Sequence, residues 1–394
     1  MNFWVNQSMY NILLKIFCYL IFVLFITACN GFFEKDNTPE PAPLVYMTPE
    51  IQPVQGWSTR AGTGTGDDYL KMGFSVSDHA IFTTSIKGTV TSISQEKGLQ
   101  NWQMNTDFPI TTGPGIGDDL VVIGGRRGEI LALQQNTGQI VWKTNLPSQA
   151  FAKPAIKNNI VVIKSIDGYL RALSTKDGHL IWSFQQIEPN LILRSASNPF
   201  ISNQNLFVGF ANGNLTKLNL SDGQPIWTQA LAIPQGPFAI QRMIDIDADP
   251  ILFEQHIYAA TYQGKINSLD WTTGKIFWSH NISSYTGMIA DNHAIYITDA
   301  KSHVWSFDVS SGLVNWRQDK LEARVITAPT IQDNYIVVGD AQGYLHWLNK
   351  RDGRIAARKY VGSMYTAPIV KNGVLYALTN SGHLTTYSLP SRSS

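Results

Sequence analysis

From residue 51 onward, short apolar runs alternate with turns rich in glycine, asparagine and aspartate. Residues 120–123 and 160–163 are continuous β-branched and leucine runs, and residues 169–173 form a short alternating segment. Runs of this length, bounded by such turns, predict β-strands joined by hairpins. The pattern therefore predicts an all-β fold for most of the chain.

A glycine followed four residues later by tryptophan recurs about every 40 to 50 residues. A further copy begins at Gly353 but carries Ala357 in place of the tryptophan. Each copy holds four predicted strands. Both this number and the length of the repeat are those of a β-propeller blade. The glycine and tryptophan pairs are Gly98/Trp102, Gly138/Trp142, Gly178/Trp182, Gly223/Trp227, Gly274/Trp278 and Gly312/Trp316.

Eight copies are present, and the last stops near Leu389 without its tryptophan strand. Trp57 stands alone before the first copy, so we expect its strand to complete the C-terminal blade. The prediction is an eight-bladed β-propeller of four-stranded antiparallel blades, closed by the N-terminal strand. Closure removes the exposed sheet edge of an open array. In the sixth copy His303 stands where the third strand of other copies begins with glycine.

The repeated tryptophans have a structural explanation. One large ring per blade can fill the wedge between neighbouring sheets while its N–H donates to the neighbour's backbone. We assign this role to Trp57, Trp102, Trp142, Trp182, Trp227, Trp278 and Trp316.

Residues 1–28 have the organisation of a secretory signal peptide, with one charge at Lys15, an apolar run and a small-residue site. Either Met1 or Met9 can serve as its start. The uncharged stretch is shorter than the roughly 20 residues that a transmembrane anchor requires. Residues 26–29, Ile-Thr-Ala-Cys, resemble a bacterial lipobox. That resemblance implies cleavage before Cys29, a lipid on its sulfur and, with Asn30 next, delivery to the outer membrane.

Residues 29–53 are expected to be the lipidated cysteine and a tether with five prolines, which would form an extended spacer. Residues 54–390 are the predicted propeller and residues 391–394 a C-terminal tail. Cys18 would leave with the signal peptide and Cys29 would carry lipid, so no disulfide is expected in the mature domain.

Composition and spacing exclude several classes of function. The 394-residue chain has a formal net charge of +1, too small to attract nucleic acid, which is therefore not an expected partner. Its histidines have no metal-ligand spacing, and residues 245–249 lack the glycine and closing glutamate of a calcium loop. We expect no metal, no cofactor and no catalytic residues.

Two long connections mark a candidate binding surface, from Trp182 to Pro199 and from Trp227 to Pro250. They leave consecutive blades on the same face of a propeller, and insertions on one face are typical of binding surfaces. Arginine beside apolar residues is a common binding hot spot. The alternative is that the two leucines begin the next inner strand and the two aspartates cap turns. The candidate residues are Leu191, Leu193, Arg194, Asp245 and Asp247.

The Thr-Gly-x-x-x-Trp repeat resembles that of the quinoprotein, or PQQ-like, propellers over residues 51–390. Together with the lipobox, the tether and the two loops, it resembles the BamB family of outer-membrane assembly lipoproteins. That resemblance implies a non-catalytic scaffold of the BAM complex, anchored in the outer membrane by its lipid and facing the periplasm. It also implies that the five candidate residues bind the POTRA domains of BamA. The protein would then help deliver unfolded β-barrel precursors for insertion into the membrane. Ser195 and Asn198 depart from the family's pattern.

Two alternative functions remain. A PQQ-dependent quinoprotein dehydrogenase shares the blade motif, but the disulfide of adjacent cysteines found in many of these enzymes is impossible here. A propeller that senses a periplasmic ligand is the other alternative. For a scaffold, the sequence leaves open whether loop side chains or exposed strand edges bind the partner.

Overall fold

The computed structural model describes residues 10, 12, 14–17, 38–66, 72–193 and 197–390. Residues 1–40 and 41–394 form separate compact units. In the first unit, residues 10, 12 and 14–17 are helical, and within the described chain no helix is long and apolar enough to cross a membrane. Cys29, Arg194 and residues 391–394 lie outside the described residues.

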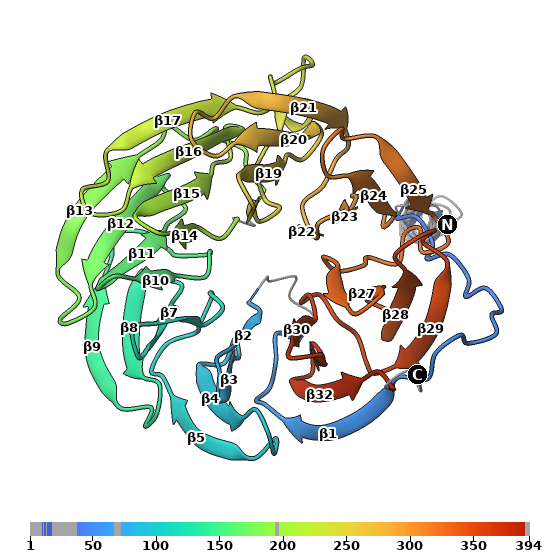
Figure 1. Ribbon diagram of the computed structural model, residues 1–394, viewed down its shortest axis with the longest axis horizontal. Helices are drawn as coiled ribbons and strands as arrows, with labels where there is room; N and C mark the ends of the chain where they lie inside the picture. The colour runs from blue at the N-terminus through green and yellow to red at the C-terminus, as the bar shows by residue number, and fades with distance from the viewer. Residues whose placement is uncertain are drawn as a thin grey trace, which may run out of the picture. The chain divides into compact units, whose positions relative to one another are not determined.

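The unit 41–394 is a ring of eight four-stranded antiparallel sheets, which confirms the predicted eight-bladed propeller (Figure 1). Blade one is β2 (Phe74–Val76), β3 (Ala80–Thr84), β4 (Thr89–Ser94) and β5 (Gln100–Asn105); blade two is β6 (Gly115–Gly117), β7 (Leu120–Gly124), β8 (Glu129–Gln134) and β9 (Ile140–Asn145). Blade three is β10 (Ala155–Lys157), β11 (Ile160–Lys164), β12 (Tyr169–Ser174) and β13 (Leu180–Gln185); blade four is β14 (Phe200–Ser202), β15 (Asn205–Gly209), β16 (Asn214–Asn219) and β17 (Pro225–Ala230).

The remaining blades follow the same order. Blade five is β18 (Ile251–Phe253), β19 (His256–Ala260), β20 (Lys265–Asp270) and β21 (Ile276–Asn281); blade six is β22 (Met288–Ala290), β23 (Ala294–Thr298), β24 (Val304–Asp308) and β25 (Val314–Gln318). Blade seven is β26 (Thr330–Gln332), β27 (Tyr335–Gly339), β28 (Tyr344–Asn349) and β29 (Ile355–Tyr360); blade eight is β30 (Ile369–Lys371), β31 (Val374–Leu378), β32 (His383–Ser388) and β1 (Val54–Arg60).

Burial follows the position of a strand within its blade. The second strand of blade two, β7, is buried at all five residues because both of its faces pack against neighbouring sheets. The outer strand β9 instead alternates, with exposed residues on either side of Trp142. The core therefore consists of the clusters between successive blades.

Ring closure occurs as predicted. β1 pairs antiparallel with β32, with Thr59 opposite Leu384 and Arg60 opposite His383. The two ends of the propeller thus share one sheet. In every blade the outer strand connects to the inner strand of the next blade, and all these connections lie on the same face of the ring. We call this face the connection face.

The repeated tryptophans lie between blades. The ring of Trp142 covers the turn glycine of the next blade, Gly178, where an added Cβ would meet the ring at 2.6 Å. Its Nε1–H donates to the Thr175 carbonyl oxygen at 2.8 Å. Trp278 covers Gly312 in the same way, but its Nε1 has no hydrogen-bond partner among the described residues.

The sixth blade corrects one sequence assignment. Ser302, not His303, takes the left-handed backbone conformation, with φ 71°, that glycine has in most other blades. His303 instead donates its backbone N–H to Asp299 Oδ1 at 2.8 Å, and its ring Nδ1 lies 2.9 Å from Asp299 Oδ2. The aspartate therefore stabilises a turn that lacks glycine.

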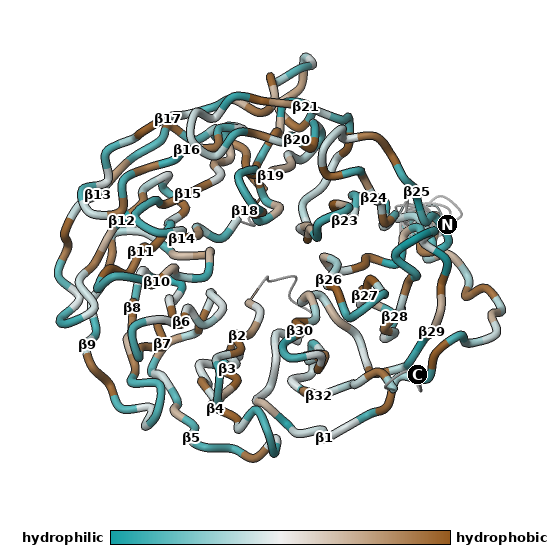
Figure 2. The backbone as a smooth tube through the Cα atoms, viewed as in Figure 1, coloured by the Kyte–Doolittle hydropathy of each residue, from teal (hydrophilic) through white to brown (hydrophobic). Residues whose placement is uncertain are grey.

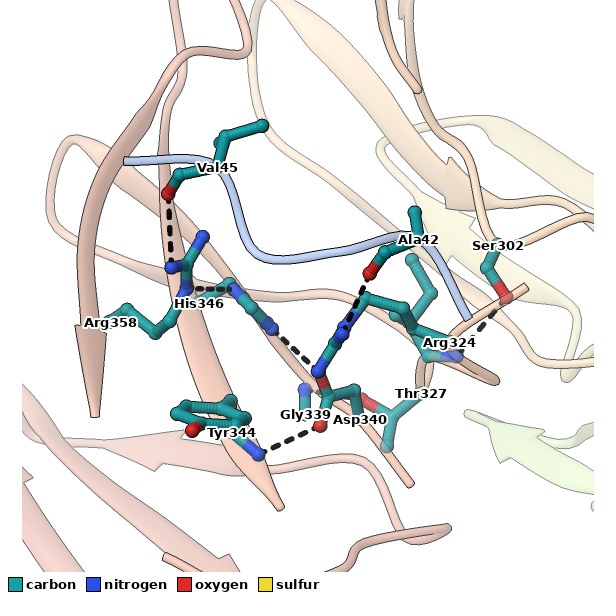
Figure 3. A network of polar contacts seen from close by, with 11 residues as sticks. Ala42, Val45, Ser302, Arg324, Thr327, Gly339, Asp340, Tyr344, His346 and Arg358 are labelled. Carbon is teal, nitrogen blue, oxygen red and sulfur yellow. Dashed lines mark hydrogen bonds and ion pairs between the residues drawn. The ribbon is translucent and has the colours of Figure 1, made fainter. Parts of the chain in front are cut away.

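The N-terminal segment 41–53 is extended but runs against blade seven (Figure 3). The Ala42 carbonyl oxygen accepts from Arg324 Nη1 at 2.9 Å, and the Val45 carbonyl oxygen accepts from Arg358 Nη1 at 3.3 Å. Farther along, the Glu50 N–H donates to the Ala356 carbonyl oxygen at 2.8 Å. This part of the predicted tether is held on the propeller, which corrects the expectation of a spacer there.

Buried groups hold the two arginines in place. Arg324 Nε and His346 Nε2 both lie against Asp340 Oδ2, at 2.7 and 2.8 Å, while Arg358 Nε donates to His346 Nδ1 at 3.3 Å. Burial lowers the pKa of His346, so the neutral ring donates from one nitrogen and accepts at the other. The cluster therefore fixes both guanidinium groups toward the N-terminal segment.

Candidate partner-binding site

The two candidate loops connect blade three to blade four and blade four to blade five. The first loop spans residues 186–199 and the second loop residues 231–250. Both lie on the connection face, as the repeat predicts, and the second contains the short 3-10 helix η2 (Ala239–Arg242).

The leucines of the first loop lie outside any strand. The next inner strand, β14, begins only at Phe200, so the alternative that Leu191 and Leu193 begin it is wrong. The side chain of Leu191 is 44% exposed and that of Leu193 is half-buried. Leu191 is therefore available to a partner protein, whereas Arg194 lies outside the described residues.

The two aspartates of the second loop lie inside the protein. Asp245 and Asp247 are each 1% exposed, so neither carboxylate reaches the surface in this conformation. Asp245 Oδ1 accepts a hydrogen bond from the Leu193 backbone N–H at 2.8 Å. This bond joins the two loops, which makes Asp245 a positioning residue for the leucine segment.

A second bridge joins the loops. Asp249 accepts hydrogen bonds from the Asn198 backbone N–H at 2.8 Å and from its side-chain amide at 2.7 Å. Asn198 Oδ1 in turn accepts from the Lys153 backbone N–H at 2.7 Å. Asn198 stood out in the sequence only as a departure from a family pattern. Asp249 was not among the candidate residues, although its place in the Asp-x-Asp-x-Asp run was a signal.

Lys164, which was not among the candidate residues, lies beneath both loops. Its ammonium donates to the Gly209 carbonyl oxygen at 2.6 Å and lies 5.5 Å from the centre of the Phe210 ring. Burial lowers the pKa of Lys164, and four carboxylates oppose that change. Those carboxylates belong to Glu188, Asp245, Asp247 and Asp249.

Two of these four carboxylates, Glu188 and Asp245, have raised pKa values. Burial raises the pKa of Asp245 to about 6, although the Leu193 N–H and Lys164 favour its ionised form. Burial also raises the pKa of Glu188. Lys164, Glu188 and Asp247 line a cavity of about 30 Å³, far below the several hundred Å³ typical of a small-molecule site. The cluster therefore supports the loops and offers no room for an organic ligand.

The loops carry large apolar side chains on their outer surface. We call Ile187, Leu191, Ile233, Phe238 and Ile240 the docking surface; their exposed fractions range from 44% to 88%. Exposed apolar side chains concentrated on two loops are typical of protein interaction sites. Only Leu191 among them was identified from the sequence.

A separate and larger hollow, with a volume of about 430 Å³, lies in the central channel. Lys153, Asn198 and Asp249 line it together with inner-strand residues of several blades. Within the described parts of the chain, no group of three or more His, Cys, Asp or Glu side chains is arranged to hold a metal ion.

The fold occurs in enzymes as well. A quinohemoprotein alcohol dehydrogenase from Comamonas testosteroni superposes with a TM-score of 0.67 at 13% identity, over 85% of this chain and 76% of its own. At that identity the likeness concerns the fold alone.

The comparisons that identify the family cover most of the chain. The family model described as outer membrane protein assembly factor BamB matches residues 86–318. A relative of that name in Legionella pneumophila is 38% identical over 90% of this chain and 93% of its own length. The crystal structure of BamB from Moraxella catarrhalis has a TM-score of 0.79 at 28% identity, covering 86% of this chain and all of that one. The chain therefore belongs to the family of outer membrane protein assembly factor BamB.

Proposed function

We propose that this protein is a non-catalytic scaffold for the assembly of outer-membrane β-barrel proteins. It is anchored in the outer membrane through lipid on Cys29, faces the periplasm, docks on the POTRA domains of BamA and helps deliver unfolded barrel precursors. The relatives are named for outer membrane protein assembly, which is the ground for proposing the same process here.

The docking surface is the observation that carries this proposal. Its apolar side chains project from loops that the hydrogen bond from Leu193 to Asp245 and those from Asn198 to Asp249 hold together. A rigid surface loses less conformational entropy on binding than a mobile one. We assign direct contacts to Leu191 and Arg194, with Arg194 pairing with partner carboxylates.

The other three candidate residues act indirectly in this proposal. Leu193, Asp245 and Asp247 hold the first loop in the shape that presents Leu191. Their replacement therefore weakens docking by disturbing the loop, and not by removing a contact with BamA.

The test is the affinity of the purified protein for purified POTRA domains, measured by calorimetry. Leu191→Asp places a charge in the apolar surface, and we expect its affinity to fall about 30-fold, equivalent to about 2 kcal/mol at hot-spot scale. Leu313→Asp is the matched control, because Leu313 is 70% exposed and lies in a hairpin turn away from the loops. Equal binding by both variants and the wild type would contradict the assignment.

A further inference from the structure

The outer strands carry a repeated irregularity. In blade three, Ala172 pairs with Trp182 while Leu173 pairs with Leu180, so Ile181 is an extra residue in the strand. The same shift occurs in blades one to seven. Such a β-bulge leaves one residue without a partner in the adjacent strand.

In blades two to five this part of the outer strand is apolar and exposed. The exposed fractions range from 42% to 56%, and hydrophobic stretches run along β9, β13 and β17 at the rim of the ring (Figure 2). We call this set the apolar strip: Ile140, Val141, Leu180, Ile181, Ile226 and Phe277.

Blade seven differs at the equivalent position. Ile355 is 7% exposed and Ala356, its bulge residue, is 0% exposed. The protein's own N-terminal segment covers them: the Glu50 N–H donates to the Ala356 carbonyl oxygen at 2.8 Å, and Ile51 packs against the cluster that contains Ala356. An ion pair of 2.7 Å between Glu50 and Arg354 adds to the contact.

Blade seven therefore shows how an extended chain occupies this position. The segment is neither helix nor part of the sheet, and it uses one backbone hydrogen bond to the bulge carbonyl and apolar side chains against the outer strand. Blades two to five have the same bulge, and a tryptophan fills the space that Ile51 takes in blade seven. A chain bound there would therefore contact their larger exposed apolar side chains, which no segment of the described chain covers.

We propose that the apolar strip binds extended polypeptide segments with apolar side chains at alternate positions. Blade seven, which holds Met47 and Ile51 by packing and Glu50 by a backbone hydrogen bond, is the precedent for an extended chain on an outer strand. This inference rests on the proposed function and names its substrate contact, because the strands of membrane barrels alternate apolar and polar residues. Four equivalent positions side by side also allow one unfolded chain to bind at several points, which raises its overall affinity.

The test uses a fluorescein-labelled peptide of twelve alternating valine and threonine residues with lysines at its ends, and a control peptide with serine in place of valine. Fluorescence anisotropy measures binding to the full-length protein. We expect the valine peptide to bind at least tenfold more tightly than the serine peptide. The double variant Val141→Lys and Ile181→Lys should bind it at least tenfold more weakly than the wild type.

The double variant Ile187→Lys and Ile233→Lys is the matched control, because it adds the same two charges to exposed residues of the docking surface. It should bind the peptide like the wild type but bind POTRA domains more weakly, whereas the strip variant should do the reverse. If the first pair alters the thermal melt, Ile226→Lys with Phe277→Lys replaces it. Equal binding of both peptides, or of wild type and folded strip variant, overturns the inference. Peptide binding without POTRA binding contradicts the docking proposal alone.

Discussion

At the scale of single residues, the contact between Trp142 and Gly178 explains why glycine and tryptophan recur together. Gly178 has φ 73° and no Cβ, so the indole of the preceding blade can lie directly on its backbone. The Thr175 carbonyl oxygen satisfies the indole N–H in the same turn. The Trp142 side chain thus fills the space between blades two and three, and its N–H links the two blades by a hydrogen bond.

Replacing Trp142 by alanine is expected to lower the free energy of unfolding by about 3–5 kcal/mol, as large-to-small core substitutions do. The cavity would open between blades two and three, where Trp142 is 6% exposed. Urea denaturation of the variant beside Trp142→Phe, which keeps most of the volume, measures the effect. An alanine variant as stable as the wild type would show that the ring does not join the blades.

Asp245 makes stability depend on pH. Its pKa is about 6 in the folded protein, against 3.8 for an ordinary aspartate. Between these values the folded state binds more protons than the unfolded state, so stability falls as pH rises from about 4 to about 6. The total change from this one group is on the order of 3 kcal/mol.

The comparison with Asp245→Asn isolates that contribution, since asparagine keeps an oxygen for the Leu193 N–H but does not titrate. The free energy of unfolding of the wild type minus that of the variant should decrease from pH 4 to pH 6 and stay constant above. A difference independent of pH would show that the Asp245 carboxylate is as well solvated as in the unfolded chain.

At the scale of elements, the closing blade explains the missing tryptophan at Ala357. Every repeated tryptophan covers the turn between the third and fourth strands of the next blade. Blade eight has no such turn, because β32 and β1 come from opposite ends of the chain. Ile51 and Leu389 pack in that place with Ala357, which is 1% exposed.

Restoring the consensus residue is therefore expected to be harmful. Ala357→Trp should lower the free energy of unfolding by about 1–3 kcal/mol, because the space for an indole is already filled. Thermal melting of the variant provides the measurement. A higher melting temperature than that of the wild type would show that the space for an indole is still open.

The repeat made the elements predictable, since the Gly and Trp period set the blade and the isolated Trp57 strand revealed the closure. The site was less accessible from sequence. Asp245 and Asp247 were identified as surface contacts because a loop sequence does not show which side of the loop is buried. Lys164, a lone lysine at the end of a strand, gave no signal that it would support loops 20 or more residues away.

At the scale of the whole molecule, the propeller presents distinct surfaces on one rigid ring. The docking surface lies over blades three to five, the apolar strip lies on the outer strands of blades two to five, and the N-terminal segment lies on blade seven. Because the N-terminal segment contacts blade seven, the chain reaches the propeller at that blade. Under the proposed function, these separate surfaces allow the scaffold to bind a partner and an unfolded chain at the same time.

The most direct test of the central claim is co-purification from detergent-solubilised membranes, comparing the wild type with the folded double variant Leu191→Asp and Arg194→Ala. The account predicts that a large outer-membrane barrel protein with periplasmic POTRA domains purifies with the wild type and is lost from the variant. If no barrel protein accompanies the wild type, the scaffold function is contradicted, and quinone-dependent oxidation becomes the activity to measure.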